Sequence, residues 1–585
     1  MPTTRRKQMS QANQTLTYLF AEMADVLEIL GVDRFRVNAF RRASRVLDGL
    51  TDDIASIGPD IKALTGIEGI GRGTAQRIAE FLETGNISDR GELMSQIPGG
   101  LIELLSIPGL GPKTIGLIWK QAGVESLDDL KEQLQHDDLA ELPGLGPKKL
   151  ENIRKSISFS ESSGDRVHLG TAMSLARWFV SKFIEFDDVQ QVEYAGSLRR
   201  GQETIGDIDL IVAADPKSAK TISNAFKSLP PVTEVLVNGT TKTSVRTTDG
   251  LQVDLRIVPP ESYGAALMYF TGSKEHNIVM RQRAISRKMR LNEYGLLKGK
   301  MTVAGRTEKE IYRALDLAPI PPELREDRGE FNLAESDELP ALIKLSDIRS
   351  ELHAHTTASD GKWTIKELAL AAAERGFHTI AITDHSKGQA QANGLTNERL
   401  EQHILEIRQV ADQLKKKITI LAGSEVDILS DGKLDYPNSL LEQLDVVVAS
   451  PHAALSQDPK KATTRLMQAI DNPHITILGH PTGRLLLRRE GLSPDMRQVI
   501  TAAYERGIAI EINANTWRLD LRDTHARAAI EAGVKLAINT DAHGPGDLDQ
   551  LLYGVVTARR AGATKHDIVN CLSREALNRW IKGTK

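Results

Sequence analysis

Seven short apolar segments that alternate with helical stretches are the strongest constraint on how this 585-residue chain can fold. All lie between residues 346 and 585, and they read RSELHAH, TIAITDH, ITILAGSEVD, VVVASPH, ITILGH, IAIEINA and KLAINTDAH. Strands that alternate with helices are typical of a parallel β/α barrel or sheet, in which a helix forms each crossover. The sequence therefore predicts a parallel β/α domain for residues 346–585.

Six of the seven segments finish on side chains that bind metal ions. The carboxyl ends of the strands meet at one rim of a β/α barrel, so ligands from distant parts of the chain converge there. This explains why 11 of the 14 histidines lie in residues 346–585. Any single histidine would more often be an ordinary loop residue, but this many strand-end ligands without thiols favour several Zn²⁺, Mn²⁺ or Fe²⁺ ions. The candidate ligands are His353, His355, Asp360, His385, Glu425, His452, His480, Asp541 and His543.

A phrase repeated three times organises the first 158 residues. It reads GIEGIGRGTAQRI at 66–78, SIPGLGPKTIGLI at 106–118 and ELPGLGPKKLENI at 141–153. Glycine permits a tight turn, and the free N–H groups at the start of the following helix can bind an anion. One copy would fit an ordinary turn between helices equally well, but three near-identical copies favour phosphate binding. The candidate residues are Gly69, Gly71, Gly109, Gly111, Lys113, Gly144 and Gly146.

Three carboxylates are expected to converge in the middle of the chain. In GDIDLIV, Asp207 and Asp209 are two residues apart, so both point to one face of a strand. Asp254 occupies a similar place in LQVDLRIV, and AGSLRRG at 195–201 provides a turn with two arginines. A lone Asp-x-Asp is often only a solvated edge strand, but three close carboxylates would raise one another's pKa unless divalent cations neutralised them. The pattern therefore predicts a metal-dependent phosphate site.

Composition excludes several classes of protein. The single cysteine, Cys571, rules out a disulfide framework and suits a reducing cytoplasm. No apolar run reaches the roughly 18 residues of a membrane span, and QANQT near the start is not the apolar core of a signal peptide. A net charge of −4 argues against a chain coated with basic charge, although it averages local basic clusters with acidic segments.

These motifs resemble two known families. Residues 10–318 are similar to a family X DNA polymerase, with helix–hairpin–helix motifs and a nucleotidyltransferase palm. Residues 346–585 resemble a PHP (polymerase and histidinol phosphatase) domain, a seven-stranded β/α barrel with a trinuclear metal site. The order of regions is that of the bacterial family X polymerases. The implied fold is multidomain, α+β and α/β, with a helical N-terminal region, a palm with thumb and a C-terminal (β/α)₇ barrel.

The resemblance also implies roles for individual residues. Asp207, Asp209 and Asp254 match the family's catalytic metal ligands, and Arg281 matches a contact to the template strand. Arg281 begins a basic run that reaches residue 290. The positions that match contacts to the incoming nucleotide are Gly196, Ser197, Arg200, Gly206, Tyr269, Phe270, Gly272 and Asn277. Arg484 and Arg518 are further candidates for binding substrate phosphate in the barrel.

Five regions are expected from these boundaries. Residues 1–83 form a helical lyase-like domain with the first hairpin, and residues 84–160 form the fingers with the other two. Residues 161–318 form the palm and thumb, residues 319–345 have the proline-rich and charged composition of a linker, and residues 346–585 form the barrel.

The resemblance implies a polymerase (nucleotidyltransferase) that fills short gaps in DNA repair and a metal-dependent 3′→5′ exonuclease, with AP endonuclease or 3′-phosphatase activity in some relatives. The expected cofactors are Mg²⁺ or Mn²⁺ at the palm and up to three Mn²⁺, Zn²⁺ or Fe²⁺ ions at the barrel. The expected partners are gapped, nicked or 3′-tailed DNA and dNTPs, for a monomer in the cytoplasm, associated with the nucleoid and not with a membrane. The alternatives are a small-molecule phosphoesterase of the PHP type and a DNA-binding scaffold with weak catalysis.

Several departures from the family pattern bear on activity. The lysine that forms a Schiff base in the lyase members corresponds to Arg77, and an assisting tyrosine corresponds to Phe40. A guanidinium stays protonated and cannot form an imine, so no deoxyribose-phosphate lyase activity is expected. In the barrel, Glu351 stands where aspartate is usual and Thr516 where proline is usual, and neither change removes a ligand.

Overall fold

The computed structural model describes residues 11–584 apart from 33, 50–53, 68, 108–109, 136–138, 141, 148, 151–152, 155–156, 158–165, 240, 488–490 and 545. The chain divides into two compact units. One consists of residues 1–165 with two short palm segments, 233–236 and 246–250, and the other contains the rest of the chain. Gly109 of the second hairpin lies outside the described residues.

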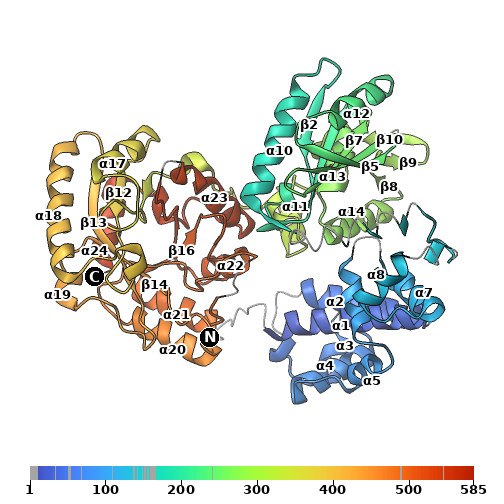
Figure 1. The fold of residues 1–585 in the computed structure, drawn as a ribbon, viewed down its shortest axis with the longest axis horizontal. Coiled ribbons are helices and arrows are strands. Elements are labelled where there is room, and N and C mark those ends of the chain that lie inside the picture. The colour runs from blue at the N-terminus through green and yellow to red at the C-terminus, as the bar shows by residue number, and fades with distance from the viewer. Residues whose placement is uncertain are drawn as a thin grey trace. The chain divides into compact units, whose positions relative to one another are not determined.

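The N-terminal unit is helical (Figure 1). Its helices share one apolar core, to which Leu16, Phe20 and Ile115 contribute. Glycines in the left-handed conformation, Gly85 and Gly123, end α4 and α7. The helices are α1 (Gln11–Leu30), α2 (Arg34–Gly49), α3 (Ile61–Thr65), α4 (Arg72–Thr84), α5 (Ser88–Met94), α6 (Gly100–Glu103), α7 (Pro112–Ala122) and α8 (Leu127–Gln135).

The palm is a five-stranded sheet with helices on both faces. The strand order is β2-β4-β7-β6-β5, and the central strands β4 and β7 are parallel. Alternation along β4 puts Ile208 and Leu210 in a core with α10 and α12, and Ile211 in a core with α13 on the other face. The elements are α10 (Leu169–Ile184), β2 (Gln191–Tyr194), α11 (Gly196–Arg199), β3 (Thr204–Ile205), β4 (Asp207–Ala213), α12 (Ala219–Lys227), β5 (Val232–Asn238), β6 (Lys242–Thr247), β7 (Gln252–Val258) and α13 (Tyr263–Thr271).

The thumb combines helices with a small antiparallel sheet of order β10-β9-β8. Residues 319–345, expected to be a linker from their composition, carry α16 and bury Ile320, Leu324 and Phe331 in the thumb core. The elements are α14 (Lys274–Ser286), β8 (Arg290–Asn292), β9 (Gly295–Lys298), β10 (Met301–Ala304), α15 (Glu308–Ala314) and α16 (Glu330–Glu335).

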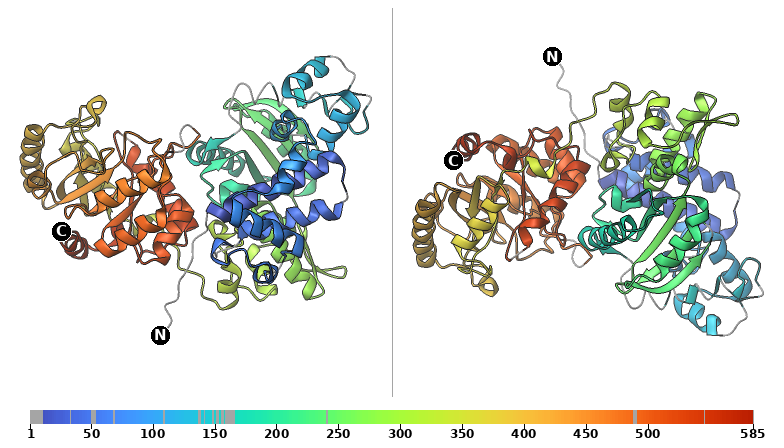
Figure 2. Two further views of the ribbon diagram at one scale, coloured as in Figure 1. Left: turned by 90° about the horizontal axis from the view of Figure 1, so that it is seen from below. Right: turned by 90° about the horizontal axis from the view of Figure 1, so that it is seen from above.

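The C-terminal region is a parallel seven-stranded barrel with helices around it (Figures 1 and 2). The strands follow one another in sequence order, and a bridge between Ala354 and Ala542 brings the first and last strands together. Apolar side chains inside the barrel pack against Leu577 and Ile581 of α24 (Arg574–Gly583), which fills one end. The strands are β11 (Ser350–Glu351), β12 (Thr379–Ile382), β13 (Thr419–Asp427), β14 (Val446–Ser450), β15 (Ile477–Leu478), β16 (Ala509–Asn513) and β17 (Leu536–Asn539).

The outer helices of the barrel begin at side-chain caps. Thr364 and Glu367 form a capping box at the start of α17, and Asp495 caps α21. Apolar side chains on these helices pack against the outward faces of the strands. The helices are α17 (Ile365–Glu374), α18 (Asn397–Leu414), α19 (Asn438–Leu441), α20 (Pro459–Ile470), α21 (Met496–Arg506), α22 (Asp523–Glu531) and α23 (Leu551–Arg560).

Candidate metal centres

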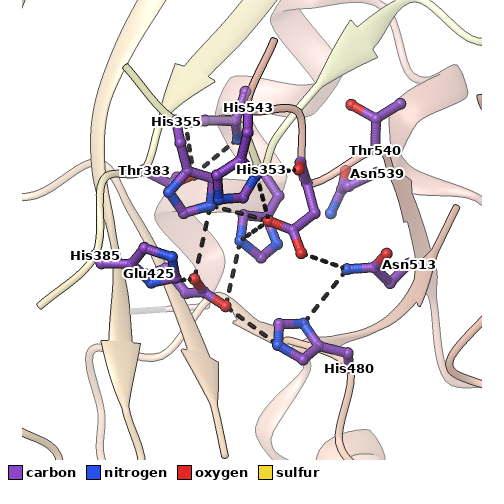
Figure 3. A network of polar contacts seen from close by, with 12 residues as sticks. His353, His355, Thr383, His385, Glu425, His480, Asn513, Asn539, Thr540 and His543 are labelled. Carbon is purple, nitrogen blue, oxygen red and sulfur yellow. Dashed lines mark hydrogen bonds and ion pairs between the residues drawn. The ribbon is translucent and has the colours of Figure 1, made fainter. Parts of the chain in front are cut away.

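The nine candidate ligands of the barrel gather near the carboxyl ends of the strands. Figure 3 shows six of them turned toward one another, namely His353, His355, His385, Glu425, His480 and His543. Oε1 of Glu425 lies 3.4 Å from His353 Nε2, 3.2 Å from His452 Nε2 and 3.3 Å from His480 Nε2. Its other oxygen lies 2.7 Å from His385 Nδ1. Both oxygens of Glu425 therefore lie close to histidine ring nitrogens that could share a cation with it.

The remaining ligands form a second group beside Glu425. His355 Nε2 lies 3.0 Å from Asp541 Oδ1, and Asp360 Oδ1 lies 3.3 Å from His543 Nε2. The clusters overlap, since His355 belongs both to the group with Asp360, His385 and His543 and to the group with His353, Glu425 and Asp541. The structure thus places all nine predicted side chains within reach of shared cations.

Unpaired buried atoms show that the residues fit a metal centre. Among the described residues, His353 Nε2, both ring nitrogens of His355, both oxygens of Glu425 and Asp541 Oδ1 are buried and make no hydrogen bond of good geometry, although facing nitrogens and oxygens lie only 2.7–3.6 Å apart. Buried polar atoms are normally paired, and leaving one unpaired costs about 1–3 kcal/mol. Nitrogen and oxygen donors that converge without partners suit divalent cations.

Electrostatics within the cluster are consistent with cation binding. Burial alone would lower the pKa of His353, but the carboxylates of Glu511, Glu425 and Asp541 outweigh it and raise that pKa well above its usual value. Burial alone would raise the pKa of Glu425, but the surrounding histidines hold it well below its usual range. Burial and two neighbouring histidines lower the pKa of His355 to about 4, so its imidazole is neutral at pH 7 and able to ligate.

Glu511 is a functional residue that the strand-end motifs did not reveal. Its Oε1 lies 2.8 Å from His353 Nδ1 and its Oε2 lies 3.1 Å from His480 Nδ1. One carboxylate therefore fixes the ring orientation of two imidazoles whose Nε2 atoms face Glu425. Its strand, IAIEINA, is the one segment that does not finish on a ligand. The acidic residue within that apolar run was the one sequence feature that could have pointed to Glu511.

Two further carboxylates support the rim. Asp427 Oδ1 lies 2.5 Å from His452 Nδ1, which leaves His452 Nε2 directed at Glu425. Asp384 accepts from His403 Nε2 at 2.8 Å and from the amide of Thr356 at 2.9 Å, and it holds the loop that follows β11. These contacts show a layer of buried acids behind the ligands.

The two barrel arginines proposed as phosphate contacts have different surroundings. Arg484 donates to the backbone oxygens of Arg518 and Leu519 and, at 2.7 Å, to Glu203 of the palm. Its guanidinium therefore serves the contact between palm and barrel. Arg518 Nε lies 3.6 Å from Asp541 Oδ2, at the edge of the ligand cluster. Arg518 remains the better candidate for a substrate phosphate.

The palm carboxylates lie on neighbouring strands in matched register. Asp209 of β4 is the direct partner of Asp254 of β7, and Asp207 is two residues away on the same face. Burial, then the nearby Asp207 and Asp254, raise the pKa of Asp209 to about 7. Lys242 Nζ lies 2.5 Å from Asp254 Oδ2 and offsets part of the negative charge. Crowded carboxylates of this kind fit divalent cations.

The turn before β4 approaches these carboxylates closely. Gly196 has φ +64°, and a Cβ there would lie 2.8 Å from Asp209 Oδ2, so any other residue would strain the backbone and displace the Asp209 carboxylate. Ser197 lies in α11, and Arg200 follows at its end. Gly206 lies directly before β4, beside the guanidinium of Arg166. The AGSLRRG turn therefore lies beside Asp209.

The segment at the end of α13 contacts the same turn. Arg200 Nη1 donates to the backbone oxygen of Thr271 at 2.5 Å and lies 3.2 Å from the position a Cβ of Gly272 would take. Asn277 Nδ2 donates to the backbone oxygen of Tyr269 at 2.7 Å, and the Tyr269 ring packs edge-on against Phe270. The structure thus brings the predicted nucleotide-contacting residues together.

The hairpin glycines lie where helices begin. Gly71 and Gly111 are the N-caps of α4 and α7, and Gly69 and Gly144 have positive φ. Gly146 directly precedes a helical residue, Pro147, and has open space where a Cβ would be. Lys113 is 65% exposed and lies 3.9 Å from Glu28. The backbone N–H groups at these helix starts can donate hydrogen bonds to DNA phosphate oxygens.

The basic run on α14 is partly neutralised. Arg283 pairs with Glu335, and Arg287 lies 3.1 Å from Asp316. Arg281 is exposed on α14 and forms no ion pair with another described residue. Arg281 therefore has the freest guanidinium of these three for contact with a nucleic acid.

Comparisons with known proteins agree with this architecture. Residues 11–87 match the helix-hairpin-helix domain, residues 101–158 the SAM-like helix-hairpin-helix tandem, residues 266–326 the DNA polymerase beta thumb and residues 351–515 the PHP domain. Among the described residues, no helix is both long and apolar enough to cross a membrane.

Curated relatives cover either the whole chain or the barrel. The chain is 37% identical over 571 residues to the DNA polymerase/3′-5′ exonuclease PolX of Bacillus subtilis (strain 168), covering 96% of this chain and 98% of that protein. It is 30% identical over 231 residues to a probable phosphatase of Thermoanaerobacter sp. (strain X514), covering 38% of this chain and 89% of the relative. The resemblance expected from the motifs is confirmed: the chain belongs to the family of bacterial family X DNA polymerases with a C-terminal PHP domain.

Proposed function

We propose that this protein is a DNA-directed DNA polymerase that fills short gaps during DNA repair and removes nucleotides from 3′ ends at a second site. The observation that carries this proposal is the presence in one chain of two ligand clusters, the carboxylate pair beside the arginine turn and the nine-ligand barrel rim. The name of the Bacillus relative combines the same two activities.

In synthesis, Arg200 and the Tyr269–Gly272 segment bind the incoming dNTP, and Asp207, Asp209 and Asp254 hold Mg²⁺ or Mn²⁺. Such cations would lower the pKa of the primer 3′-hydroxyl and stabilise the leaving pyrophosphate. Asp209, whose pKa rises to about 7 because of burial and its acidic neighbours, is ionised fully only once positive charge offsets that repulsion.

In hydrolysis, the barrel ligands would hold up to three Mn²⁺, Zn²⁺ or Fe²⁺ ions, with Glu425 as one of the residues that hold them. Bound ions would supply an activated water and polarise the phosphodiester. Glu511 and Asp427 keep the imidazoles oriented, and Arg518 binds a substrate phosphate at the edge of the cluster. AP-endonucleolytic cleavage of a phosphodiester and 3′-phosphatase cleavage of a phosphomonoester are both metal-assisted hydrolyses of a phosphate ester, and they belong to this proposal.

The substrate is gapped, nicked or 3′-tailed DNA, held through its backbone by the hairpins and Arg281. Contacts of this kind position DNA without reading its sequence, so affinity should fall steeply with salt. We further propose that the protein works as a monomer in the cytoplasm, associated with the nucleoid.

The N-terminal domain binds DNA without lyase chemistry. Arg77 pairs with Asp89, donates to the backbone oxygen of Gly73 at 2.7 Å and lies 5.2 Å from the Phe40 ring centroid. Arginine has no free amine that could attack the sugar aldehyde and form an imine. Borohydride treatment with a 5′-deoxyribose-phosphate substrate should give no covalent adduct, and a trapped adduct would contradict this assignment.

A gapped-duplex assay tests both sites in one tube. With dNTPs and Mg²⁺ the primer should lengthen, and with Mn²⁺ and no dNTPs it should shorten. Asp207→Ala/Asp209→Ala should abolish extension and leave degradation intact, whereas His353→Ala/His385→Ala should do the reverse. Extension that persists in the first variant, or degradation that persists in the second, rejects the corresponding assignment.

A small-molecule phosphoesterase is the second candidate, because the barrel also matches probable phosphatases. A small-molecule phosphoesterase needs neither DNA-binding hairpins nor the palm carboxylates, so both features favour the polymerase. Comparing cleavage of a 3′-tailed oligonucleotide with that of histidinol phosphate, both with Mn²⁺, separates the two. Faster turnover of histidinol phosphate would favour the phosphoesterase.

A further inference from the structure

A buried arginine of the barrel contacts the nucleotide-binding turn of the palm. Arg560, at the end of α23, is 5% exposed. Its Nη1 donates to the backbone oxygen of Arg200 at 2.6 Å and to Glu326 Oε1 at 3.0 Å. Its Nη2 donates to Asp523 Oδ2 of α22 at 2.8 Å. A single guanidinium therefore connects the palm turn with two barrel helices.

Glu326 extends this connection to the side chain of Arg200. The same oxygen, Oε1, accepts from Arg200 Nε at 3.0 Å and from Gln202 Nε2 at 2.7 Å. Arg560 thus holds the backbone of Arg200 directly, and it holds the Arg200 guanidinium indirectly, through Glu326. Charge-assisted hydrogen bonds of this kind fix geometry more strongly than neutral ones.

Apolar packing brings α23 against the same turn. Gly201 has φ +68°, and a Cβ there would overlap Val556 Cγ1. Leu552 and Tyr553 of α23 pack with Val556 against the palm core. A second close contact joins Gly170 of α10 to Thr516 of the barrel, since a Cβ on Gly170 would meet the Thr516 methyl group at 2.5 Å. The turn that carries Arg200 therefore rests directly on the barrel.

We propose that Arg560 is a positioning residue for nucleotide binding at the palm: the barrel helix α23 holds the turn that presents Arg200 to the triphosphate. The inference rests on the proposed polymerase function. Arginine is required because its planar fork serves the Arg200 backbone, Glu326 and Asp523 at once, and a lysine amine cannot span all three. The barrel would then contribute to synthesis independently of its own metal site.

Steady-state gap filling by the full-length Arg560→Gln variant tests this role. We expect the KM for dNTP to rise about tenfold with kcat changed less than threefold, because Arg200 is displaced and the metal-binding carboxylates are not. Arg560→Lys should fall between wild type and Arg560→Gln. Exonuclease activity on a 3′-tailed oligonucleotide should stay within twofold of wild type, which shows that the barrel is folded.

Arg559→Gln is the matched control. Arg559 is the preceding residue of the same helix, and it contacts Glu323 and the backbone oxygen of Ile343 without reaching the turn. A KM within twofold of wild type in Arg560→Gln, or an equal rise in Arg559→Gln, would overturn the proposal. If Arg560→Gln loses exonuclease activity, Asp523→Asn replaces it, with the same expected rise in KM and the same criterion. Wild-type protein without gap-filling activity would instead reject the polymerase function.

Discussion

Replacing Glu511 by glutamine should weaken metal binding at the barrel rim. The carboxylate is fully buried and accepts from both His353 Nδ1 and His480 Nδ1. A glutamine amide offers one acceptor oxygen, and its NH₂ group would face the other imidazole N–H. One of the two rings therefore loses the partner that holds its Nε2 toward Glu425.

The expected size of the effect follows from the groups that Glu511 holds in place. Changing a group that orients a metal ligand typically lowers metal affinity roughly 10- to 100-fold. Glu511 orients two ligands and also accepts from the backbone amide of His480 at 2.9 Å and from Asn539 Nδ2 at 2.9 Å. We therefore expect the upper half of that range, about 2–3 kcal/mol of binding free energy.

The assay is a Mn²⁺ titration of metal-stripped full-length protein against a competing chelator, with bound ions counted by mass spectrometry. Exonuclease activity should fall with the affinity, and gap filling should not change. Glu351→Gln is the matched control, because Glu351 is also buried but accepts from the amides of Leu352 and His353 and from Thr540. A Mn²⁺ affinity of Glu511→Gln within threefold of wild type, or a loss equal to that of the control, would refute the reasoning.

Three other predictions concern the thumb and the palm. Glu308→Gln should lower the thumb's free energy of unfolding by roughly 3–5 kcal/mol, as measured by hydrogen exchange, because it leaves the guanidinium of Arg325, which is 2% exposed, without its carboxylate partner. The control Asp316→Asn removes one member of an exposed ion pair and should cost less than about 1 kcal/mol. Equal losses in the two variants would contradict this. Burial alone would raise the pKa of Glu308, but its arginine partners bring it to about 2. Its stabilisation is therefore fully present above pH 4.5 and is lost as the pH falls through 2, and an undiminished difference between wild type and Glu308→Gln well below pH 2 would refute this. Gly196→Ala should reduce gap filling at least tenfold at unchanged exonuclease activity, because its Cβ would displace Asp209, and normal gap filling would disprove the close approach.

Much of the barrel could be predicted from the sequence because its signals are local. Each apolar segment became a strand at the expected place, and the ligands follow at the strand ends. Parallel strands share one direction, so their carboxyl ends must meet at one rim. In the palm, a spacing of two residues put Asp207 and Asp209 on one face for the same kind of reason.

Other features could not be predicted because they depend on which element packs beside which. A strand covered on both faces has no polar alternation, so the sequence does not show that Glu511 points inward. Prolines and alternating charge in residues 319–345 indicated a linker, although Leu324 and Phe331 are buried against thumb helices. Composition is a property of the segment, whereas burial depends on its neighbours.

The sequence by itself determined the two chemistries, because metal ligands and phosphate-binding turns are defined by residue type and short spacing. Only the tertiary structure decided how the arginines are used. Arg484 contacts Glu203, and Arg560 contacts the backbone of Arg200, across separations of 281 and 360 residues. No periodicity in the chain encodes such pairs, because they form only when the palm packs against the barrel.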